Sequence, residues 1–194
     1  MKYHKFRQQL ARVSRELYRE KLITATGGNL SLRLPGGEGF LITPSGTFKG
    51  ELQSHSMVTL DNRGYPAVEA SGPPPSIETS LHLQIYQLRK EIGAVIHTHA
   101  PAAIIAGLYE MNIPPLTREM LQFKELPLIP YYPPGSPELA TATAATLEKH
   151  PTVRALLLQN HGLVTIGSNL REAANIALSL EEACRISILC RLLK

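Results

Sequence analysis

The chain has 194 residues, of which 43% are hydrophobic and 19% charged, and its formal net charge is +4. This composition excludes a disordered chain, and the length suits one folded domain spanning residues 1–194. Basic residues are scattered, which argues against nucleic-acid binding, and no apolar run approaches the roughly 20 residues that cross a bilayer. Because the N-terminus is too polar for a signal peptide, we expect a cytoplasmic protein without membrane contact.

The first elements predicted along the chain are one helix and three strands. Apolar residues at helical spacing predict an amphipathic helix over residues 2–22. After a glycine turn, alternating residues 30–34 predict a strand with leucines on one face. Two short apolar runs, 40–43 and 57–60, lead into turn sequences and complete a meander.

A helix, a strand and a second helix follow. Three prolines precede Ser76, which we expect to cap a helix that runs to about Lys90. Glu78 would lie in the first turn of that helix. Residues 94–99 predict a strand, after which proline opens a helix over residues 101–108.

The rest of the chain is predicted to contain a proline-rich stretch, a helix, two strands and a last long helix. Residues 112–135 are expected to be irregular apart from one short strand. Asn169 and Glu172 form a sequence like a capping box at the start of the last helix. The remaining predicted elements are a strand at 128–129, a helix beginning at Ser136-Pro137-Glu138, and strands at 155–158 and 163–166.

Strands occur in clusters, with helices between only some of them. This order favours an α/β fold in three layers, α/β/α, with a mainly antiparallel central sheet. Cys184 and Cys190 are six residues apart, so on a helix their side chains would point about 120° away from each other. We therefore expect neither a disulfide nor a Cys-x-x-Cys metal site, and place both cysteines in the core or an interface.

Three histidines are candidates for a metal site. In a strand, His97 and His99 would project from the same face, roughly 7 Å apart at the backbone. Such a pair can share a cation, or each ring can form ordinary local hydrogen bonds. His161 follows an apolar strand and precedes Gly162, which permits close backbone approach. Three neutral imidazoles with an open position indicate a catalytic zinc site, although Mn²⁺ or Co²⁺ would also suit them.

Proton transfer must fall to glutamate or histidine, since Asp61 is the only aspartate. Glu78 is either a partner of the helix dipole or, beside a cation, an acid/base group. The other histidines lack comparable settings, so we interpret them as surface residues or as satisfied by hydrogen bonds. His82 lies one turn beyond Glu78 on the same helix face. These other histidines are His4, His55, His82 and His150.

Two loops of small residues and one helix start could together bind phosphate. Gly27-Gly28-Asn29 and Thr43-Pro44-Ser45-Gly46 offer backbone N–H groups with an amide or a hydroxyl, and Ser76 precedes a helix whose N-terminus attracts anions. If they converge, they make a phosphate cup. Taken singly, each is explained by ordinary turn chemistry.

In order, Gly-Gly-Asn-Leu-Ser, Ile-Thr-Pro-Ser-Gly, Pro-Ser-x-Glu, His-Thr-His and Asn-His-Gly resemble the class II aldolase/adducin family across nearly the whole chain. The resemblance implies its layered, AraD-like fold and a homotetramer with active sites between subunits. It also implies zinc bound by His97, His99 and His161, with Glu78 as the acid/base. Phosphate contacts would map onto Gly28, Asn29, Ser45, Gly46 and Ser76, with Thr26 and Thr43 beside them.

Two departures from the L-fuculose-1-phosphate aldolase pattern fall on residues with a role in its chemistry. Ile77 stands where that pattern has a second serine that grips phosphate, and residues 116–120 lack the tyrosine that a neighbouring subunit donates as general acid. Glu119-Met120 instead resembles methylthioribulose-1-phosphate dehydratases, in which the glutamate is an acid/base. Tyr131 or Tyr132 could otherwise replace the missing acid.

The leading prediction is a metal-dependent aldolase that acts on a small phosphorylated sugar. It would reversibly cleave a ketose 1-phosphate, similar to fuculose 1-phosphate, into dihydroxyacetone phosphate and a short aldehyde through a metal-stabilised ene-diolate. The alternatives are dehydration of methylthioribulose 1-phosphate, motivated by Ile77 and Glu119, and 4-epimerisation of a sugar phosphate. A non-enzymatic module like the adducin head is a further alternative, but it would not need three histidines and Glu78 together.

Overall fold

The computed structural model describes residues 2–66 and 72–193, which contain one seven-stranded sheet with strand order β3-β2-β1-β4-β7-β6-β5. Neighbouring strands are antiparallel except for β5 and β6, which are parallel. The predicted mainly antiparallel sheet is therefore confirmed. Its strands are β1 (Asn29–Arg33), β2 (Phe40–Ile42), β3 (Val58–Leu60), β4 (Ala94–Thr98), β5 (Leu128–Ile129), β6 (Ala155–Leu158) and β7 (Gly162–Gly167).

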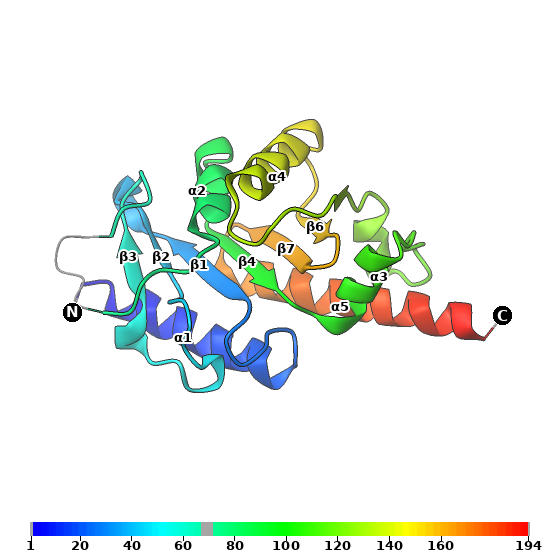
Figure 1. Cartoon of the computed structure of the whole chain (residues 1–194), viewed down its shortest axis with the longest axis horizontal. Helices are drawn as coiled ribbons and strands as arrows, with labels where there is room; N and C mark the ends of the chain where they lie inside the picture. Colours follow the sequence, from blue (N-terminus) through cyan, green and yellow to red (C-terminus); the bar gives the residue numbers. More distant parts are fainter. Residues whose placement is uncertain (1, 67–71, 194) are drawn as a thin grey trace.

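Helices cover both faces of the sheet (Figure 1). Buried side chains of α1, α3 and α5 form one hydrophobic cluster, and those of α2 and α4 form a second cluster across the sheet. These two clusters with the sheet between them make the three predicted layers. The helices of the described residues are α1 (His4–Arg19), α2 (Thr79–Leu88), α3 (Pro101–Leu108), α4 (Pro137–Lys149) and α5 (Leu170–Leu192).

Side-chain alternation along the strands decides which residues face each layer. In β1, Leu30 and Leu32 join the cluster of α1, α3 and α5, whereas Ser31 bonds to groups on α2. In β4, Ile96 joins the α1, α3 and α5 cluster, and Val95 joins the cluster of α2 and α4. Since His97 has the same parity as Val95, it faces the layer of α2 and α4.

The predicted starts of the last two helices are confirmed. Ser136 Oγ accepts the N–H of Leu139 at 3.1 Å, and Asn169 Oδ1 accepts the N–H of Glu172 at 2.9 Å. The reciprocal bond of a capping box is absent from the described hydrogen bonds, because the Glu172 carboxylate accepts the N–H of Ser168 instead. Each of these helices thus has one orphan N–H satisfied by its N-cap side chain.

The start of α2 differs from the prediction. The helix begins at Thr79, and Glu78 is its N-cap residue rather than a member of the first turn. Ser76 lies in a turn before the helix, where its Oγ accepts the N–H of Glu78 at 3.3 Å. The reason is that the N–H of Ser76 donates to the carbonyl of Thr43 at 3.3 Å, which keeps this segment beside the loop after β2.

Three other local results bear on the predictions. β4 ends at Thr98, so His99 lies one residue beyond the strand, and residues Glu119–Phe123 form a 3₁₀ turn inside the stretch predicted to be irregular. Cys184 and Cys190 are free, as predicted; Cys184 is buried in the core, whereas Cys190 is exposed and lies outside it. Within the described part of the chain, no helix combines the length and apolarity required to cross a bilayer.

Candidate active site

The three predicted histidines come together at one end of the sheet. His97 is fully buried, and its Nδ1–H donates to the carbonyl of Leu163 on β7 at 2.9 Å. This bond leaves Nε2 of His97 free to act as a ligand. His161 follows Asn160, whose left-handed backbone (φ 57°) turns the chain between β6 and β7. Nε2 of His97 lies 3.0 Å from Nε2 of His99, and the ligand atoms of all three lie within 4.8 Å of one another.

The residues present fit a divalent cation. Burial lowers the pKa of His97 well below its ordinary value and that of His161 to about 4, so both rings are neutral near pH 7 and offer lone pairs. Nδ1 of His161 and Oε2 of the nearby Glu78 are buried without a hydrogen-bond partner among the described residues. A cation would compensate such groups, so the trio can hold a metal ion and keep a position open for substrate.

Glu78 lies beside this cluster. Its side chain is 3% exposed, and Oε1 is 3.8 Å from Nε2 of His161. Oε1 also accepts the N–H of Gly135 at 2.9 Å. Burial raises the pKa of the Glu78 carboxyl, and the N–H of Gly135 opposes that rise by stabilising the carboxylate. A carboxyl under these opposing influences suits reversible proton transfer.

The glycines before β1 lie very close to the clustered histidines. A Cβ on Gly27 would lie 2.6 Å from Nδ1 of His99, and one on Gly28 would lie 3.2 Å from the carbonyl oxygen of His97. Gly28 also has a φ of 82°, which favours glycine. The predicted phosphate loop is therefore directly adjacent to the histidine cluster.

Hydrogen bonds join the three segments that were predicted to form the phosphate cup. The N–H of Leu30, next to Asn29, donates to Thr43 Oγ1 at 3.1 Å. The N–H of Ser45 donates to the carbonyl of Pro74 at 2.9 Å, which aligns the loop after β2 with the segment before α2. The N–H of Ser45 is thus already used, and its hydroxyl and the exposed Gly46 remain as the groups of this loop that could bind phosphate, as predicted for these two residues.

Lys49 is a residue of this region that sequence reasoning missed. Its side chain is 1% exposed, and Nζ donates to the carbonyl of Pro44 at 2.6 Å. Its backbone N–H donates to the carbonyl of Ala25 at 2.8 Å, so the residue links the loop after β2 to the segment just before the Gly27-Gly28-Asn29 loop. Burial lowers the pKa of Lys49 to about 8. No sequence signal distinguishes this lysine from its exposed counterparts.

His82 is buried and satisfied by hydrogen bonds. The sequence had left open whether it is such a residue or a surface residue. Its ring nitrogens bond to Ser31 and to Asn29, a predicted phosphate ligand. Sequence reasoning noted only its position one turn beyond Glu78. The link to β1 was missed because the partners are more than 50 residues apart.

The structure does not bring Glu119 to the histidine cluster within the chain. Glu119 is exposed in the 3₁₀ turn that packs against α5, and hydrogen bonds within residues 117–119 lower the pKa of its carboxyl. Among the described residues, no hydrogen bond or ion pair links it to a histidine. Tyr131 is also exposed and Tyr132 half-buried, in the loop that leads to Gly135 beside Glu78. Thr26 is exposed next to the glycine loop.

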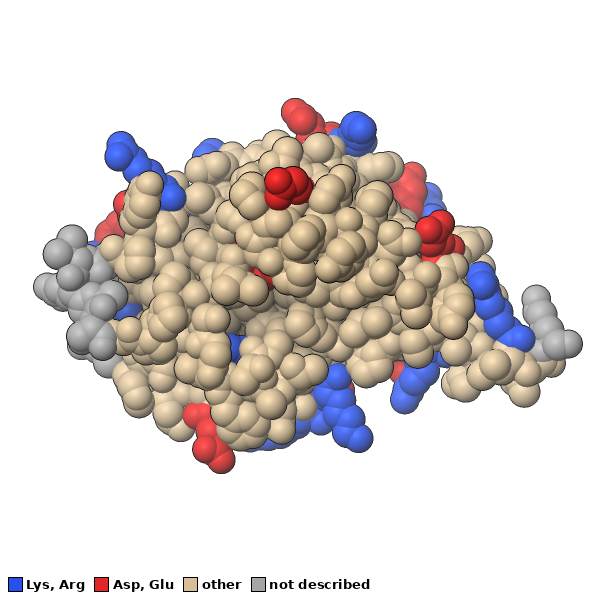
Figure 2. All heavy atoms as spheres, in the orientation of Figure 1, with Lys and Arg blue, Asp and Glu red and all other residues tan. Residues whose placement is uncertain are grey.

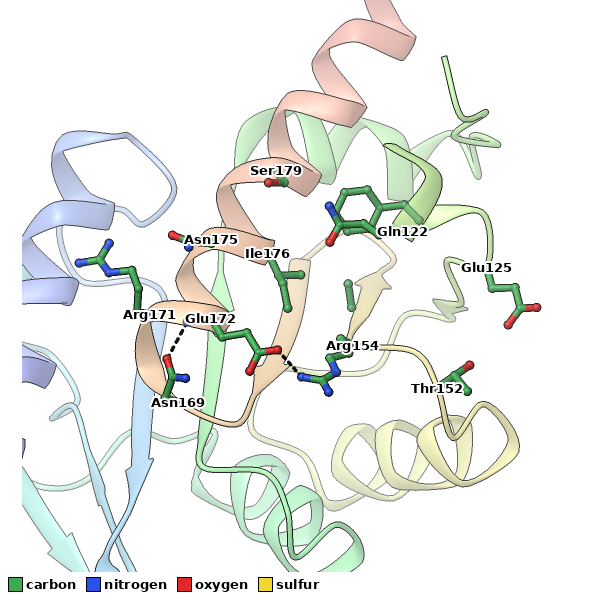
Figure 3. A pocket seen from close by; sticks show the side chains of 12 residues that line it. Gln122, Glu125, Thr152, Arg154, Asn169, Arg171, Glu172, Asn175, Ile176 and Ser179 are labelled. Carbon is green, nitrogen blue, oxygen red and sulfur yellow. Dashed lines mark hydrogen bonds and ion pairs between the residues drawn. The ribbon is translucent and has the colours of Figure 1, made fainter. Parts of the chain in front are cut away.

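A separate cavity of about 690 Å³ lies at the α5 side of the sheet (Figure 3). None of the predicted site residues lines it. Both arginines that line it are engaged in ion pairs: Arg154 lies 2.5 Å from Glu172, which also lines the cavity, and Arg171 lies 2.5 Å from Glu16. Figure 2 shows that most charged side chains on the face viewed in Figure 1 lie near its edge, with an acidic group over the region of α4 and small acidic and basic patches in the centre. The histidine cluster is thus the better candidate site.

A model of the family described as "Class II Aldolase and Adducin N-terminal domain" matches residues 8–188. The chain belongs to the class II aldolase and adducin family. The resemblance inferred from the ordered motifs is therefore confirmed.

Three relatives show the range of activities named among similar chains. An L-fuculose phosphate aldolase from Methanocaldococcus jannaschii is 33% identical over 97% of this chain and 98% of its own length. A 5-methylthioribulose-1-phosphate/5-deoxyribulose-1-phosphate aldolase from Escherichia coli is 32% identical over 96% and 84%. A 3-oxo-tetronate 4-phosphate decarboxylase from E. coli is 34% identical over 93% and 84%.

Solved structures of class II aldolases have the same fold. An L-fuculose 1-phosphate aldolase aligns with a TM-score of 0.86 and 31% identity, covering 96% of this chain and 86% of the other. The class II aldolase fold predicted from the motifs is confirmed by this alignment.

Proposed function

We propose that the chain is a metal-dependent aldolase that reversibly cleaves a ketose 1-phosphate into dihydroxyacetone phosphate and a short aldehyde. His97, His99 and His161 would hold the cation, which is Zn²⁺ in this proposal because three imidazoles with an open position suit it. Mn²⁺ and Co²⁺ fit the same ligands. The relatives named as sugar-phosphate aldolases support this substrate class.

The observation that carries the proposal is the juxtaposition of three neutral imidazoles, a buried carboxyl and a glycine loop. Glu78 lies 3.8 Å from His161, and the Gly27-Gly28 loop contacts the other two histidines. A cation site, an acid/base and a cup for an anion are thus adjacent. These are the parts that cleavage of a carbon–carbon bond next to a carbonyl requires.

In the cleavage direction, the phosphate of the substrate would rest against the loops at Gly28, Asn29, Ser45, Gly46 and Ser76. A base takes the proton of the C4 hydroxyl, the C3–C4 bond breaks, and the electron pair moves toward the C2 oxygen. A bound cation supplies Lewis acidity that stabilises negative charge on this oxygen. Glu78 then gives a proton to C3, which releases dihydroxyacetone phosphate. The base at C4 would be Tyr131, Tyr132 or a neighbouring copy's Glu119.

The test combines metal content with product analysis. Natively purified protein should contain about one divalent ion per chain and should release dihydroxyacetone phosphate from a ketose 1-phosphate such as fuculose 1-phosphate or ribulose 1-phosphate. Glu78→Gln should retain the metal and the fold but lose at least about a hundredfold in turnover, the typical contribution of an acid/base group. Wild-type turnover in Glu78→Gln would refute the role of Glu78.

Decarboxylation of a 3-oxo acid phosphate is a second candidate, because a relative with that name is 34% identical. Both reactions place the electron pair of a broken carbon–carbon bond next to a carbonyl. Release of carbon dioxide from 3-oxo-tetronate 4-phosphate, without cleavage of ketose phosphates, would favour this candidate. Loss of water from methylthioribulose 1-phosphate would instead favour a dehydratase, to which Glu119-Met120 points.

We also propose that the active form is a homotetramer whose sites lie between subunits. The exposed Glu119 supports this, since it could serve only a neighbouring copy's histidine cluster. Large apolar side chains are exposed at the end of α3, namely Leu108 and the following Tyr109. Leu189 is exposed near the end of α5, which extends past the rest of the molecule (Figure 1). Sedimentation of a species four times the chain mass would support assembly. A monomer with full activity would exclude shared sites.

A further inference from the structure

A buried chain of hydrogen bonds connects α2 with the first residue of β1. Oη of Tyr86 lies 2.8 Å from Oγ of Ser31, which lies 2.6 Å from Nδ1 of His82. Nε2 of His82 lies 2.6 Å from Oδ1 of Asn29. Asn29 is 5% exposed and the other three side chains less, so bulk water does not compete for these bonds.

The chemistry of the groups fixes the direction of each bond. The amide oxygen of Asn29 carries no proton, so Nε2 of His82 must donate to it. Burial lowers the pKa of His82 to about 3, so the ring is neutral and its Nδ1 carries no proton. Nδ1 therefore accepts from the Ser31 hydroxyl, and the Ser31 oxygen accepts from Tyr86. As a result, the amide nitrogen of Asn29 is turned away from His82.

That nitrogen lies where the cup and the histidine cluster meet. Asn29 pairs with His97 across β1 and β4, and it directly follows Gly28. Among the described residues, the amide nitrogen of Asn29 has no hydrogen-bond partner. It is also not one of the fully buried polar atoms that lack a partner, so it is open to a ligand or to water. Its two N–H groups are therefore free donors beside the predicted phosphate loop.

We propose that His82 is a positioning residue that holds the Asn29 amide with its N–H groups toward the anionic group of the substrate. This inference rests on the proposed function, which supplies a phosphorylated substrate. Without His82, the amide can rotate by half a turn and present its oxygen, which repels an anion. Tyr86 and Ser31 hold His82 in the tautomer that prevents this rotation.

Two substitutions of His82 separate positioning from packing. In His82→Gln, the side-chain amide nitrogen can take the place of Nε2 and donate to Asn29. In His82→Asn, the shorter amide can bond to Ser31 but does not reach Asn29. Thr143→Val is the control for loss of a buried polar group in the same layer, because Thr143 is fully buried on α4 and donates to Leu139 at 2.8 Å.

The first measurement is the dissociation constant of inorganic phosphate for the metal-loaded protein, with KM for a ketose 1-phosphate alongside. We expect His82→Asn to raise both constants about tenfold, the effect of one lost hydrogen bond. His82→Gln should stay within about twofold of wild type, as should Thr143→Val. In an Asn29→Ala background, His82→Asn should cause no further loss, since the amide it positions is gone.

The second measurement is the ¹⁵N spectrum of His82, which reports its tautomer without any substrate. A protonated Nε2 supports the inference, and a protonated Nδ1 overturns it. Unchanged phosphate binding in His82→Asn, an equal loss in His82→Gln, or no phosphate binding by wild type would each overturn it as well. If the expected differences in phosphate binding appear but no ketose phosphate is cleaved, the proposed function fails and the positioning role of His82 stands.

Discussion

Glu78 and Gly135 are 57 residues apart in the sequence, yet the backbone N–H of Gly135 donates to Oε1 of Glu78 at 2.9 Å. The bond connects the residue before α2 to the loop before α4. Because the donor to Glu78 is a backbone N–H, no side-chain substitution deletes it directly. The hydrogen bond can be removed only by moving the loop that contains Gly135. The left-handed φ of 75° at Gly135 makes such a displacement possible with a single methyl group.

Gly135→Ala should move the pH profile of the enzyme. A Cβ there would lie 3.1 Å from the carbonyl oxygen of Ile77, in a backbone conformation that alanine disfavours, so the loop must shift. Because the Gly135 N–H lowers the pKa of Glu78, its loss should raise the apparent pKa of the acidic limb of kcat by up to about one unit. Gly72→Ala, where a Cβ meets nothing within 4 Å, is the control. An unshifted limb in Gly135→Ala would contradict the coupling.

If the three clustered histidines hold the proposed metal, replacing any one of them should remove it. His97→Ala, His99→Ala and His161→Ala should each reduce bound metal, measured by elemental analysis after gel filtration, from about one ion per chain to less than about 0.1, because two imidazoles bind far more weakly than three. His55→Ala alters an exposed histidine and should keep the full content. Retention of metal by all three cluster variants would place the ion elsewhere.

The metal-free protein should lose stability as the pH falls below about 6.5. Burial lowers the pKa of His82 to about 3 and that of His161 to about 4, so the unfolded chain binds protons in this range that the native chain does not. Each such histidine contributes up to about 1.4 kcal/mol per pH unit to the fall in the free energy of unfolding. His82→Gln should therefore have a shallower dependence between pH 4 and 6 in urea titrations. Parallel curves for the two proteins would mean that His82 is not held neutral.

Lys49→Met should weaken the binding of phosphorylated substrates in a pH-dependent manner. The ammonium group of Lys49 bonds to Pro44 next to the predicted cup, and its charge should attract the phosphate. At pH 7 we expect KM to rise about tenfold. Because the pKa of Lys49 is about 8, the difference from wild type should shrink as the pH rises toward 9.5 and the wild-type charge is lost. Lys90→Met, at an exposed lysine, should leave KM unchanged.

Glu181 should stabilise the protein through the start of α3. Its two carboxylate oxygens accept the N–H groups of Ala102 and Ala103, both at 2.9 Å. Glu181→Ala should lower the free energy of unfolding by about 1–2 kcal/mol, because two N–H groups at a helix N-terminus lose a charged acceptor. Glu182→Ala removes an exposed ion pair with Arg185 and should cost less than about 1 kcal/mol. Equal losses in denaturant titrations would contradict the capping role.

Most elements could be predicted because their signals are local. The helix at 101–108 follows from a proline at its start and apolar residues after it, and the structure has the same bounds. Strand alternation near Leu30 predicted that Leu30 and Leu32 share one face, and both join the cluster of α1, α3 and α5. The predicted start of α2 was wrong by two residues, because Glu78 rather than Ser76 is the N-cap. Ser76 pairs with Thr43, a contact between segments that no local pattern reports.

The site could be predicted only in part, for the same reason. His97, His99 and His161 form a recognisable set of ligands, and their juxtaposition agrees with that expectation. The bonds between His82 and Asn29 and between Gly135 and Glu78 span more than 50 residues each, and they depend on how α2 and the loop before α4 pack on the sheet. Glu119 was assigned from a two-residue resemblance, and within the chain it lies away from the cluster.

The alternation of β1 has a consequence for how sequence variation should be tolerated there. Leu30 and Leu32 face the cluster of α1, α3 and α5, while Asn29 and Ser31 face the hydrogen-bond chain that leads to the candidate site. Saturation mutagenesis across this strand should therefore give two kinds of defect that alternate from one residue to the next. Substitutions at positions 30 and 32 should reduce the yield of folded protein, and substitutions at positions 29 and 31 should yield folded protein with poor activity.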